Sequence, residues 1–139
     1  MNLRYLLMMR SEWFEERVVQ AATAHGYGFV TPAMNRIFAH MRHQPVSISE
    51  LARQLVISRQ AVHQTVAEAQ RRGIVELTDD PADRRLKMVR FTEKGMEMSR
   101  SAAQAIRDIE DELERQLGAR DLAALKRILG KEWGERKAD

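Results

Sequence analysis

The sequence predicts a mainly α-helical chain that contains one small β-wing. Three observations support this fold class. Apolar side chains recur at three- and four-residue spacing over most of the chain, and the pattern changes to alternation between residues 74 and 91. Serine, threonine, glycine and proline stand where one segment gives way to the next. The length of 139 residues fits one domain, or two small lobes with a shared core, and needs no disulfide or metal to fold.

The first 43 residues predict two helices. Residues 2–25 carry an amphipathic pattern that ends at the glycines of residues 26–28. Thr31 is expected to cap a second helix, with Pro32 at its first position and the Gln44-Pro45 pair at its end. The apolar face of this helix is expected to consist of Met34, Ile37, Phe38 and Met41.

The middle of the chain predicts a helix-turn-helix followed by a hairpin. After an extended piece at residues 46–48, Ser49 is expected to cap a helix that ends near Leu55. Ser58 is expected to cap a second helix, which Gly73 ends. Strands at residues 74–77 and 86–91, joined by an acidic turn, then form the hairpin. This order predicts a winged helix-turn-helix.

The remainder predicts two more helices. Thr92 is expected to cap a long helix to Leu117, and after Gly118 a last helix runs from Arg120 to Trp133. A domain of this size cannot cover the apolar stripes of its first and last helices, so we expect a homodimer. The chain is therefore divided into an N-terminal dimerisation helix (1–30), a winged helix-turn-helix lobe (31–92) and C-terminal dimerisation helices (93–139).

Composition and charge restrict the function. Without cysteine there is no disulfide, thiolate metal site or thiol sensor, and apolar runs are too short to span a bilayer. The first residues carry no cleavage signal, so a cytoplasmic protein without membrane contact is expected. Residues 44–92 hold eight basic and six acidic side chains, whereas residues 93–139 hold ten and eleven. An anion-binding surface therefore belongs to the front or middle of the chain.

Polar side chains gather where a helix-turn-helix contacts bases. The second helix of such a pair enters the major groove of duplex DNA with its first turns, and a hairpin tip can place arginine in the minor groove or on phosphate. Taken singly, an ordinary surface helix and a solvated turn explain these residues equally well. In this order they predict DNA binding by Ser58, Arg59, Gln60, His63, Gln64, Arg84 and Arg85.

These segments resemble the MarR (multiple-antibiotic-resistance regulator) family. The resemblance lies in residues 28–32 (GFVTP), 48–62 (ISELARQLVISRQAV), 72–76 (RGIVE) and 80–95 (DPADRRLKMVRFTEKG). It implies a homodimeric transcriptional regulator whose flanking helices dimerise and whose wings grip a pseudo-palindromic operator. One of the two wing arginines is expected in the minor groove, with the other on Asp83 or a neighbouring acid.

Two positions depart from the family pattern. Many members have an acidic residue in the recognition helix that braces the wing arginine, where this chain has Ala67 with Glu68 beside it. An arginine is frequent where this chain has Leu77. Both departures concern how the wing is braced.

The resemblance also implies a small aromatic or anionic ligand between the dimer helices and the DNA-binding lobe. Arg17 is expected to meet a carboxylate. For any single one of these side chains, packing in the core or the dimer interface is the simpler explanation. The candidate residues are Trp13, Phe14, Arg17, Phe38 and Met41.

Other classes find less support. His40 and His43 have the spacing of two metal ligands but no third ligand nearby, so neither a metal nor a cofactor is expected. No glycine-rich phosphate loop or nucleophile elbow is present, so no enzyme is expected. We expect a repressor that occludes a promoter and is released by a small ligand. The alternatives are a winged-helix protein–protein adaptor and a DNA binder that senses no ligand.

Overall fold

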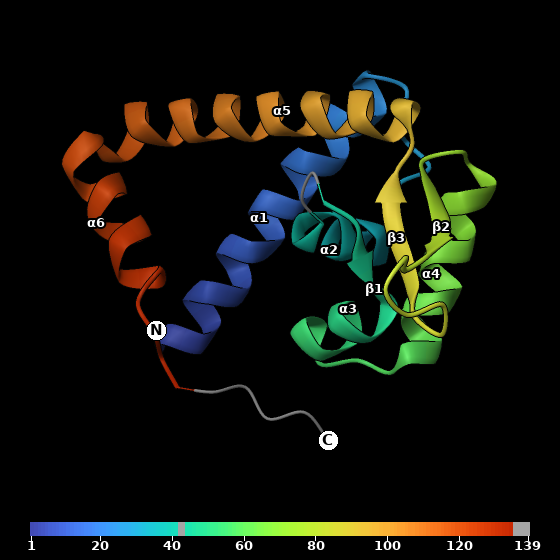
Figure 1. Cartoon of the computed structure of the whole chain (residues 1–139). Coiled ribbons are helices and arrows are strands. Elements are labelled where there is room, and N and C mark those ends of the chain that lie inside the picture. Colours follow the sequence, from blue (N-terminus) through green and yellow to red (C-terminus); the bar gives the residue numbers. More distant parts are fainter. Residues whose placement is uncertain (42–43, 135–139) are drawn as a thin grey trace.

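The computed structural model describes residues 1–41 and 44–134, and within these ranges it confirms the mainly helical fold with a small β-wing (Figure 1). In the described part of the chain, no helix is long and apolar enough to cross a bilayer. The elements in chain order are α1 (Leu3–Ala24), α2 (Pro32–His40), β1 (Val46–Ser47), α3 (Ile48–Leu55), α4 (Arg59–Arg71), β2 (Val75–Asp79), β3 (Lys87–Phe91), α5 (Glu93–Leu117) and α6 (Ala119–Leu129).

Side-chain caps set most helix starts. The predicted caps Thr31, Ser58 and Thr92 each accept a hydrogen bond from the backbone N–H three residues on, at 3.1 Å. The prediction of Ser49 as a cap was wrong, because Ser47 Oγ accepts from the Glu50 N–H at 3.0 Å. Ser47 is still extended (φ −74°, ψ 151°), so the helix begins directly where the short strand ends.

Two helix ends also differ from the prediction. α2 ends at His40, because Met41 is already extended (ψ 137°), although its side chain still enters the core. α6 ends at Leu129, with Gly130 as its C-cap, so Trp133 lies beyond the helix. In both cases the apolar pattern continues past the last helical turn, and periodicity alone gives no end point.

The wing is a three-stranded antiparallel sheet with the order β1-β3-β2. β1 pairs with β3 through Val46 and Val89, which adds the predicted extended piece to the predicted hairpin. Opposite residues of an antiparallel pair share one face, so Val75 and Leu77 face the core together with Phe91 and Val89.

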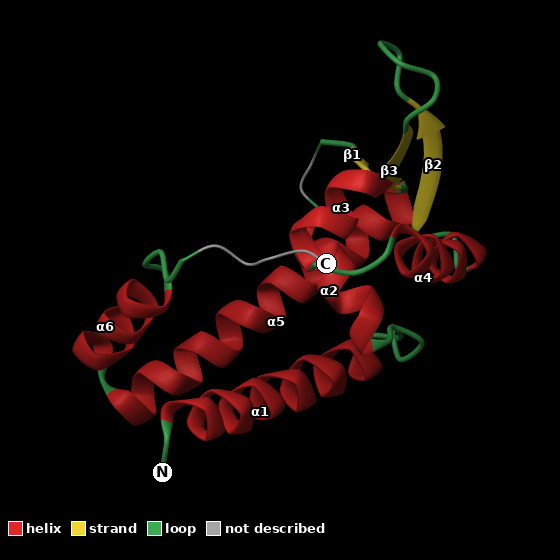
Figure 2. Ribbon diagram, turned by 90° about the horizontal axis from the view of Figure 1, so that it is seen from below, coloured by secondary structure: helices red, strands yellow, loops and turns green. Residues whose placement is uncertain are grey.

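The hydrophobic core lies in the winged-helix lobe (residues 31–92) and in the residues that adjoin it. The side chains of Ile37, Leu51, Val62, Ile74 and Val89 are almost completely inaccessible to solvent. By contrast, neither α1 nor α6 contains a buried residue. Figure 2 shows α1 and α5 side by side, α6 at the far end of α5, and the β2–β3 hairpin projecting from the lobe.

Candidate nucleic-acid interface

The predicted recognition residues lie on the solvent-exposed side of α4. Ser58, Arg59, Gln60, His63 and Gln64 are all exposed. The opposite side of α4 is buried through an apolar row at helical spacing, which fixes the helix on the lobe. The structure therefore brings these five side chains together on one surface, at the N-terminal end of the helix. The buried row consists of Val62, Val66 and Ala69.

The turn between α3 and α4 is short and strained. Val56 adopts a left-handed conformation (φ 55°, ψ 47°), which is unusual for a β-branched residue, and its N–H donates to the Arg53 carbonyl at 3.3 Å. The left-handed residue turns the chain within residues 56–58, so that α4 starts immediately after the turn. The strain is held by the packing of α3 against α4.

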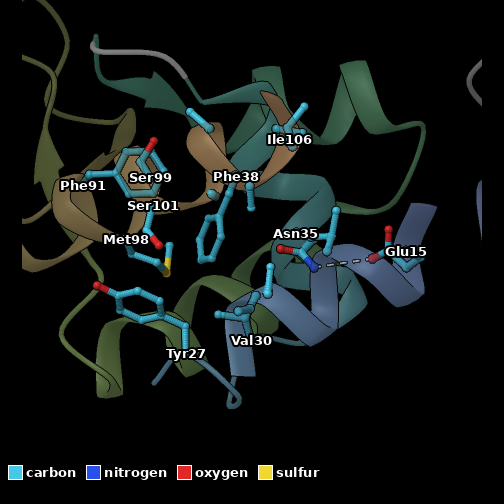
Figure 3. A pocket seen from close by; sticks show the side chains of 17 residues that line it. Glu15, Tyr27, Val30, Asn35, Phe38, Phe91, Met98, Ser99, Ser101 and Ile106 are labelled. Carbon is cyan, nitrogen blue, oxygen red and sulfur yellow. Dashed lines mark hydrogen bonds between the residues drawn. The ribbon is translucent and has the colours of Figure 1, made fainter. Parts of the chain in front are cut away.

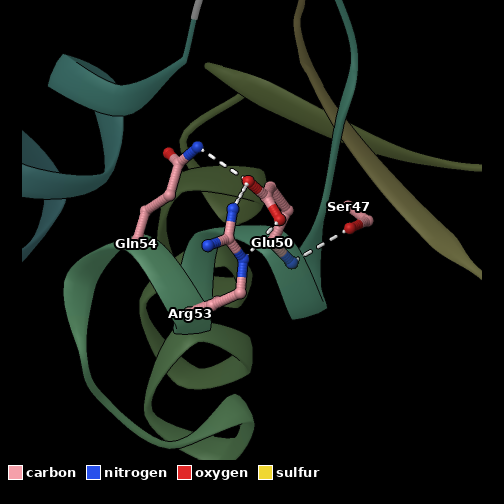
Figure 4. Close-up of polar contacts among 4 residues, drawn as sticks. All are labelled: Ser47, Glu50, Arg53 and Gln54. Carbon is pink, nitrogen blue, oxygen red and sulfur yellow. Dashed lines mark hydrogen bonds and ion pairs between the residues drawn. The ribbon is translucent and has the colours of Figure 1, made fainter. Parts of the chain in front are cut away.

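Arg53, the basic side chain nearest this turn, is paired with Glu50 in a polar cluster on α3 (Figure 4). Glu50 accepts two hydrogen bonds from the Arg53 guanidinium and one from Gln54 Nε2 at 2.8 Å. The bonds from Arg53 lower the pKa of Glu50, and the same carboxylate raises the pKa of Arg53. Arg53 is therefore partly neutralised by its own helix, which leaves Arg59 as the exposed cation at the start of α4.

The wing tip separates the two predicted arginines. Asp83 accepts the Nε–H and Nη2–H of Arg85 at 3.0 Å each, and the Arg85 backbone N–H at 3.1 Å. These bonds lower the pKa of Asp83 and raise that of Arg85. The side chain of Arg84 is exposed and makes no hydrogen bond or ion pair with any residue in ranges 1–41 and 44–134. The sequence left open which arginine binds the acid; the structure selects Arg85.

The base of the wing is held without the two expected polar residues. Leu77 is partly buried against the core, opposite Val89. Cross-strand ion pairs join Lys87 to Asp79 and Arg90 to Glu76. Ala67 is partly buried and carries no group that could brace an arginine. In this chain the wing is therefore braced by apolar packing at Leu77 and by its own cross-strand ion pairs.

A cavity of about 320 Å³ lies between α1, α2 and α5 (Figure 3). Of the five ligand candidates named from the sequence, only Phe38 lines it. Sequence reasoning missed Tyr27, which follows the end of α1, and Asn35, which donates from Nδ2 to Glu15 Oε1 at 3.4 Å. The one signal for α5 as a cavity wall was its run of small residues between positions 99 and 105.

The other four ligand candidates lie outside this cavity. Trp13 and Phe14 pack edge to face, with ring centroids 5.2 Å apart. Arg17 stacks over the Trp13 ring at 4.4 Å and donates from Nη1 to Glu112 Oε2 at 2.9 Å, which joins α1 to α5. Met41 is a core residue with 6% exposure. The structure does not gather the five side chains around one site.

Of the two histidines considered as metal ligands, His40 lies in the described part of the chain. His40 Nδ1–H donates to the Arg36 carbonyl at 2.9 Å, and His43 lies outside the described residues. Within the described residues, no group of three or more His, Asp and Glu side chains is placed to hold a metal ion.

Comparison with known proteins identifies the fold. Residues 30–86 match the model of the MarR family. The chain is similar to the transcriptional regulator PA4135 (25% identity, 93% of each chain, TM-score 0.75). It is also similar to the transcriptional repressor CouR bound to a 23-mer DNA duplex (24% identity, 92% of this chain and 89% of that one, TM-score 0.76). For wild-type MarR of E. coli, the values are 20% identity, 93% and 95% coverage, and a TM-score of 0.72. Among curated proteins, no sequence matches the chain.

Proposed function

We propose that the chain is a homodimeric, sequence-specific repressor of the MarR type that a small ligand releases from its operator. The match of residues 30–86 to the model of the MarR family supports this proposal. The observation that carries the DNA-binding part is the exposed polar face at the start of α4, together with the guanidinium of Arg84 on the wing, which pairs with no other described residue. An α-helix of this kind fits the major groove, and an arginine fits the narrow minor groove.

A second copy of the chain would cover the exposed apolar helices and would supply a second DNA-binding lobe. Large apolar side chains stay exposed along α1, α5 and α6, and burying them in a dimer removes them from water. In this proposal residues 1–30 and 93–139 dimerise, and residues 31–92 contact DNA. Two α4 helices then meet successive major grooves about 34 Å apart on a pseudo-palindromic site. The exposed set includes Leu3, Tyr5, Met8, Leu117, Leu125, Ile128 and Leu129.

Ligand release is supported by the position of the cavity. Its aromatic wall includes Tyr27, whose ring packs edge to face against Phe29 with centroids 6.4 Å apart. Arg72, the C-cap of α4, stacks over the Phe29 ring, 5.1 Å from its centroid. A small aromatic molecule that displaces Tyr27 would therefore disturb packing at the end of the recognition helix. We place this regulator in the cytoplasm, where its operator would lie.

The first experiment is a fluorescence-anisotropy titration with the DNA upstream of the protein's own gene, using random duplex as competitor at two salt concentrations. We expect strong preference for the upstream DNA and an affinity that falls steeply with salt, because phosphate contacts release counterions. Salt-sensitive binding without preference would indicate an architectural protein. No binding at low salt would favour the protein–protein adaptor.

Variants at the interface assign the contacts. Gln60→Ala or Gln64→Ala should lose about 1–3 kcal/mol of discrimination at one base pair, because a glutamine can bond an adenine edge with two hydrogen bonds. Arg84→Ala should weaken all sequences alike, and more than Arg85→Ala does, since Arg85 is bound to Asp83. Gln70→Ala, exposed at the far end of α4, is the control. Equal losses on operator and random DNA for the glutamine variants would contradict base recognition.

A further inference from the structure

The cavity between α1, α2 and α5 contains a single charged side chain among the described residues that line it. That side chain is Glu15, a carboxylate. Asn35 holds it through the bond to Oε1, and no described residue donates to Oε2. The remaining wall is mostly apolar, with the neutral polar groups of Tyr27, Ser99 and Ser101 (Figure 3).

The nearest arginine on α1 does not offset this charge. Arg17 is two residues after Glu15 on α1, but it does not line this cavity and lines a neighbouring hollow instead. Its guanidinium is already bound to Glu112 and stacked on Trp13. None of the described residues that line the cavity is a cation, so a carboxylate ligand would face the like charge of Glu15 without a positive partner among them. This costs free energy in a partly desolvated site.

The aromatic side chains of the wall, like Glu15, favour a cationic ligand. Phe38 and Phe91 lie with ring centroids 5.5 Å apart, and Tyr27 also lines the cavity. Aromatic faces carry negative partial charge and attract ammonium groups. A volume of about 320 Å³ lies at the lower end of the range for small-molecule sites, so the occupant is about the size of one ring with a short chain.

We propose that this cavity binds a small organic ammonium ion with an apolar, preferably aromatic body, and that it discriminates against aromatic carboxylates. The ammonium group lies at Glu15, and the body lies against Tyr27, Phe38 and Phe91. This proposal names the chemical class of the ligand in the proposed function. It rests on that function only where it concerns release from DNA. Binding to the cavity itself is independent of any operator.

The test uses three probes of one shape, 4-phenylbutylamine, 4-phenylbutanol and 4-phenylbutyrate, titrated calorimetrically into the full-length protein without DNA. We expect the amine to bind about five- to tenfold more tightly than the alcohol, as for a partly exposed charge pair, with the butyrate weakest. Glu15→Gln should remove the advantage of the amine and leave the affinity for the alcohol unchanged. Glu16→Gln removes the same charge from the next residue, which is exposed and outside the cavity, and should keep the full advantage.

A third variant locates the binding. Ser101→Leu fills the cavity and should weaken both the amine and the alcohol, with circular dichroism as the check on folding. Butyrate binding as tight as amine binding, an advantage that survives Glu15→Gln, or no binding of any probe would overturn the proposal. Adding the amine to an operator complex then tests release separately, so that failure to bind DNA cannot be mistaken for failure of the cavity.

Discussion

The winged-helix lobe and the helices around it have similar fractions of apolar residues, but the lobe buries these side chains and the surrounding helices leave many of them exposed. Among the described residues, twelve of the fifteen buried apolar side chains belong to residues 31–92. Of the thirteen large apolar side chains that remain exposed, only Ile57 and Leu86 lie in that range. The lobe closes its own core, whereas α1, the outer half of α5 and α6 leave theirs open.

This difference indicates which part of the fold the proposed dimer would complete. In the lobe, helices and sheet cross one another, so each apolar face meets another within the same chain. α1 contacts α5 but runs obliquely to it, and α6 follows the end of α5, so that these helices keep sides that the described residues of the lobe do not cover (Figure 1). Disrupting each region separately should therefore have different consequences.

The largest effect is expected from charges on α6. Leu125→Glu together with Leu129→Glu places two carboxylates on an apolar face whose side chains are 42% and 46% exposed in the single chain. We expect a monomer by light scattering and an operator affinity about 10²- to 10⁴-fold lower, because two linked half-site contacts become one. The circular dichroism of the lobe should persist, since α6 contributes no buried residue. Ala123→Glu, also exposed on α6, is the matched control. If the double variant still formed dimers, α6 would not be part of the dimer interface.

A smaller effect is expected where α5 leaves the lobe. A Cβ added at Gly95 would lie 2.0 Å from the Ile74 carbonyl oxygen and 2.9 Å from Phe91 Cδ1, so backbone would have to move. Gly95→Ala should lower the free energy of unfolding by about 3 kcal/mol in urea titrations, as overpacking in a core does. At Gly28 the nearest atom would be 3.5 Å away, so Gly28→Ala should change stability by less than about 0.5 kcal/mol. Equal stabilities for the two variants would show that the junction is not rigid.

The smallest effect concerns the exposed tip of the otherwise self-contained lobe. Because Arg85 lowers the pKa of Asp83, their bond is fully formed above the ordinary aspartate pKa of about 3.9 and is lost as the pH falls through the lower folded value. The Arg85 Nε–H resonance should therefore titrate with a midpoint below about 3.9. Asp83→Asn should abolish this transition. A similar transition at Arg84 would argue against the assignment of the pair.

Local chemistry made much of the lobe predictable. A side-chain cap and a glycine mark both ends of α4, and the polar residues of its exposed face follow from helical spacing. The cap of α3 was misassigned because Ser47 and Ser49 are equally good caps, and the choice depends on where β1 stops pairing with β3. The ligand candidates were less predictable, since Trp13, Arg17 and Phe38 share helical spacing with core residues. In the structure Trp13 and Arg17 stack on each other outside the cavity, and of the three only Phe38 lines it.

The sequence by itself determined the order of helices and strands, the family resemblance and the position of the candidate DNA-binding residues, because these depend on spacing and on caps within a few residues. The local geometry of the wing turn decided that Arg85, and not Arg84, binds Asp83. Only the tertiary structure decided that Arg17 binds Glu112 and that Glu15 lies at the cavity. Such pairings depend on the distances between side chains once helices have packed. Arg17 and Glu112 are far apart in the chain and meet only because α1 lies against α5.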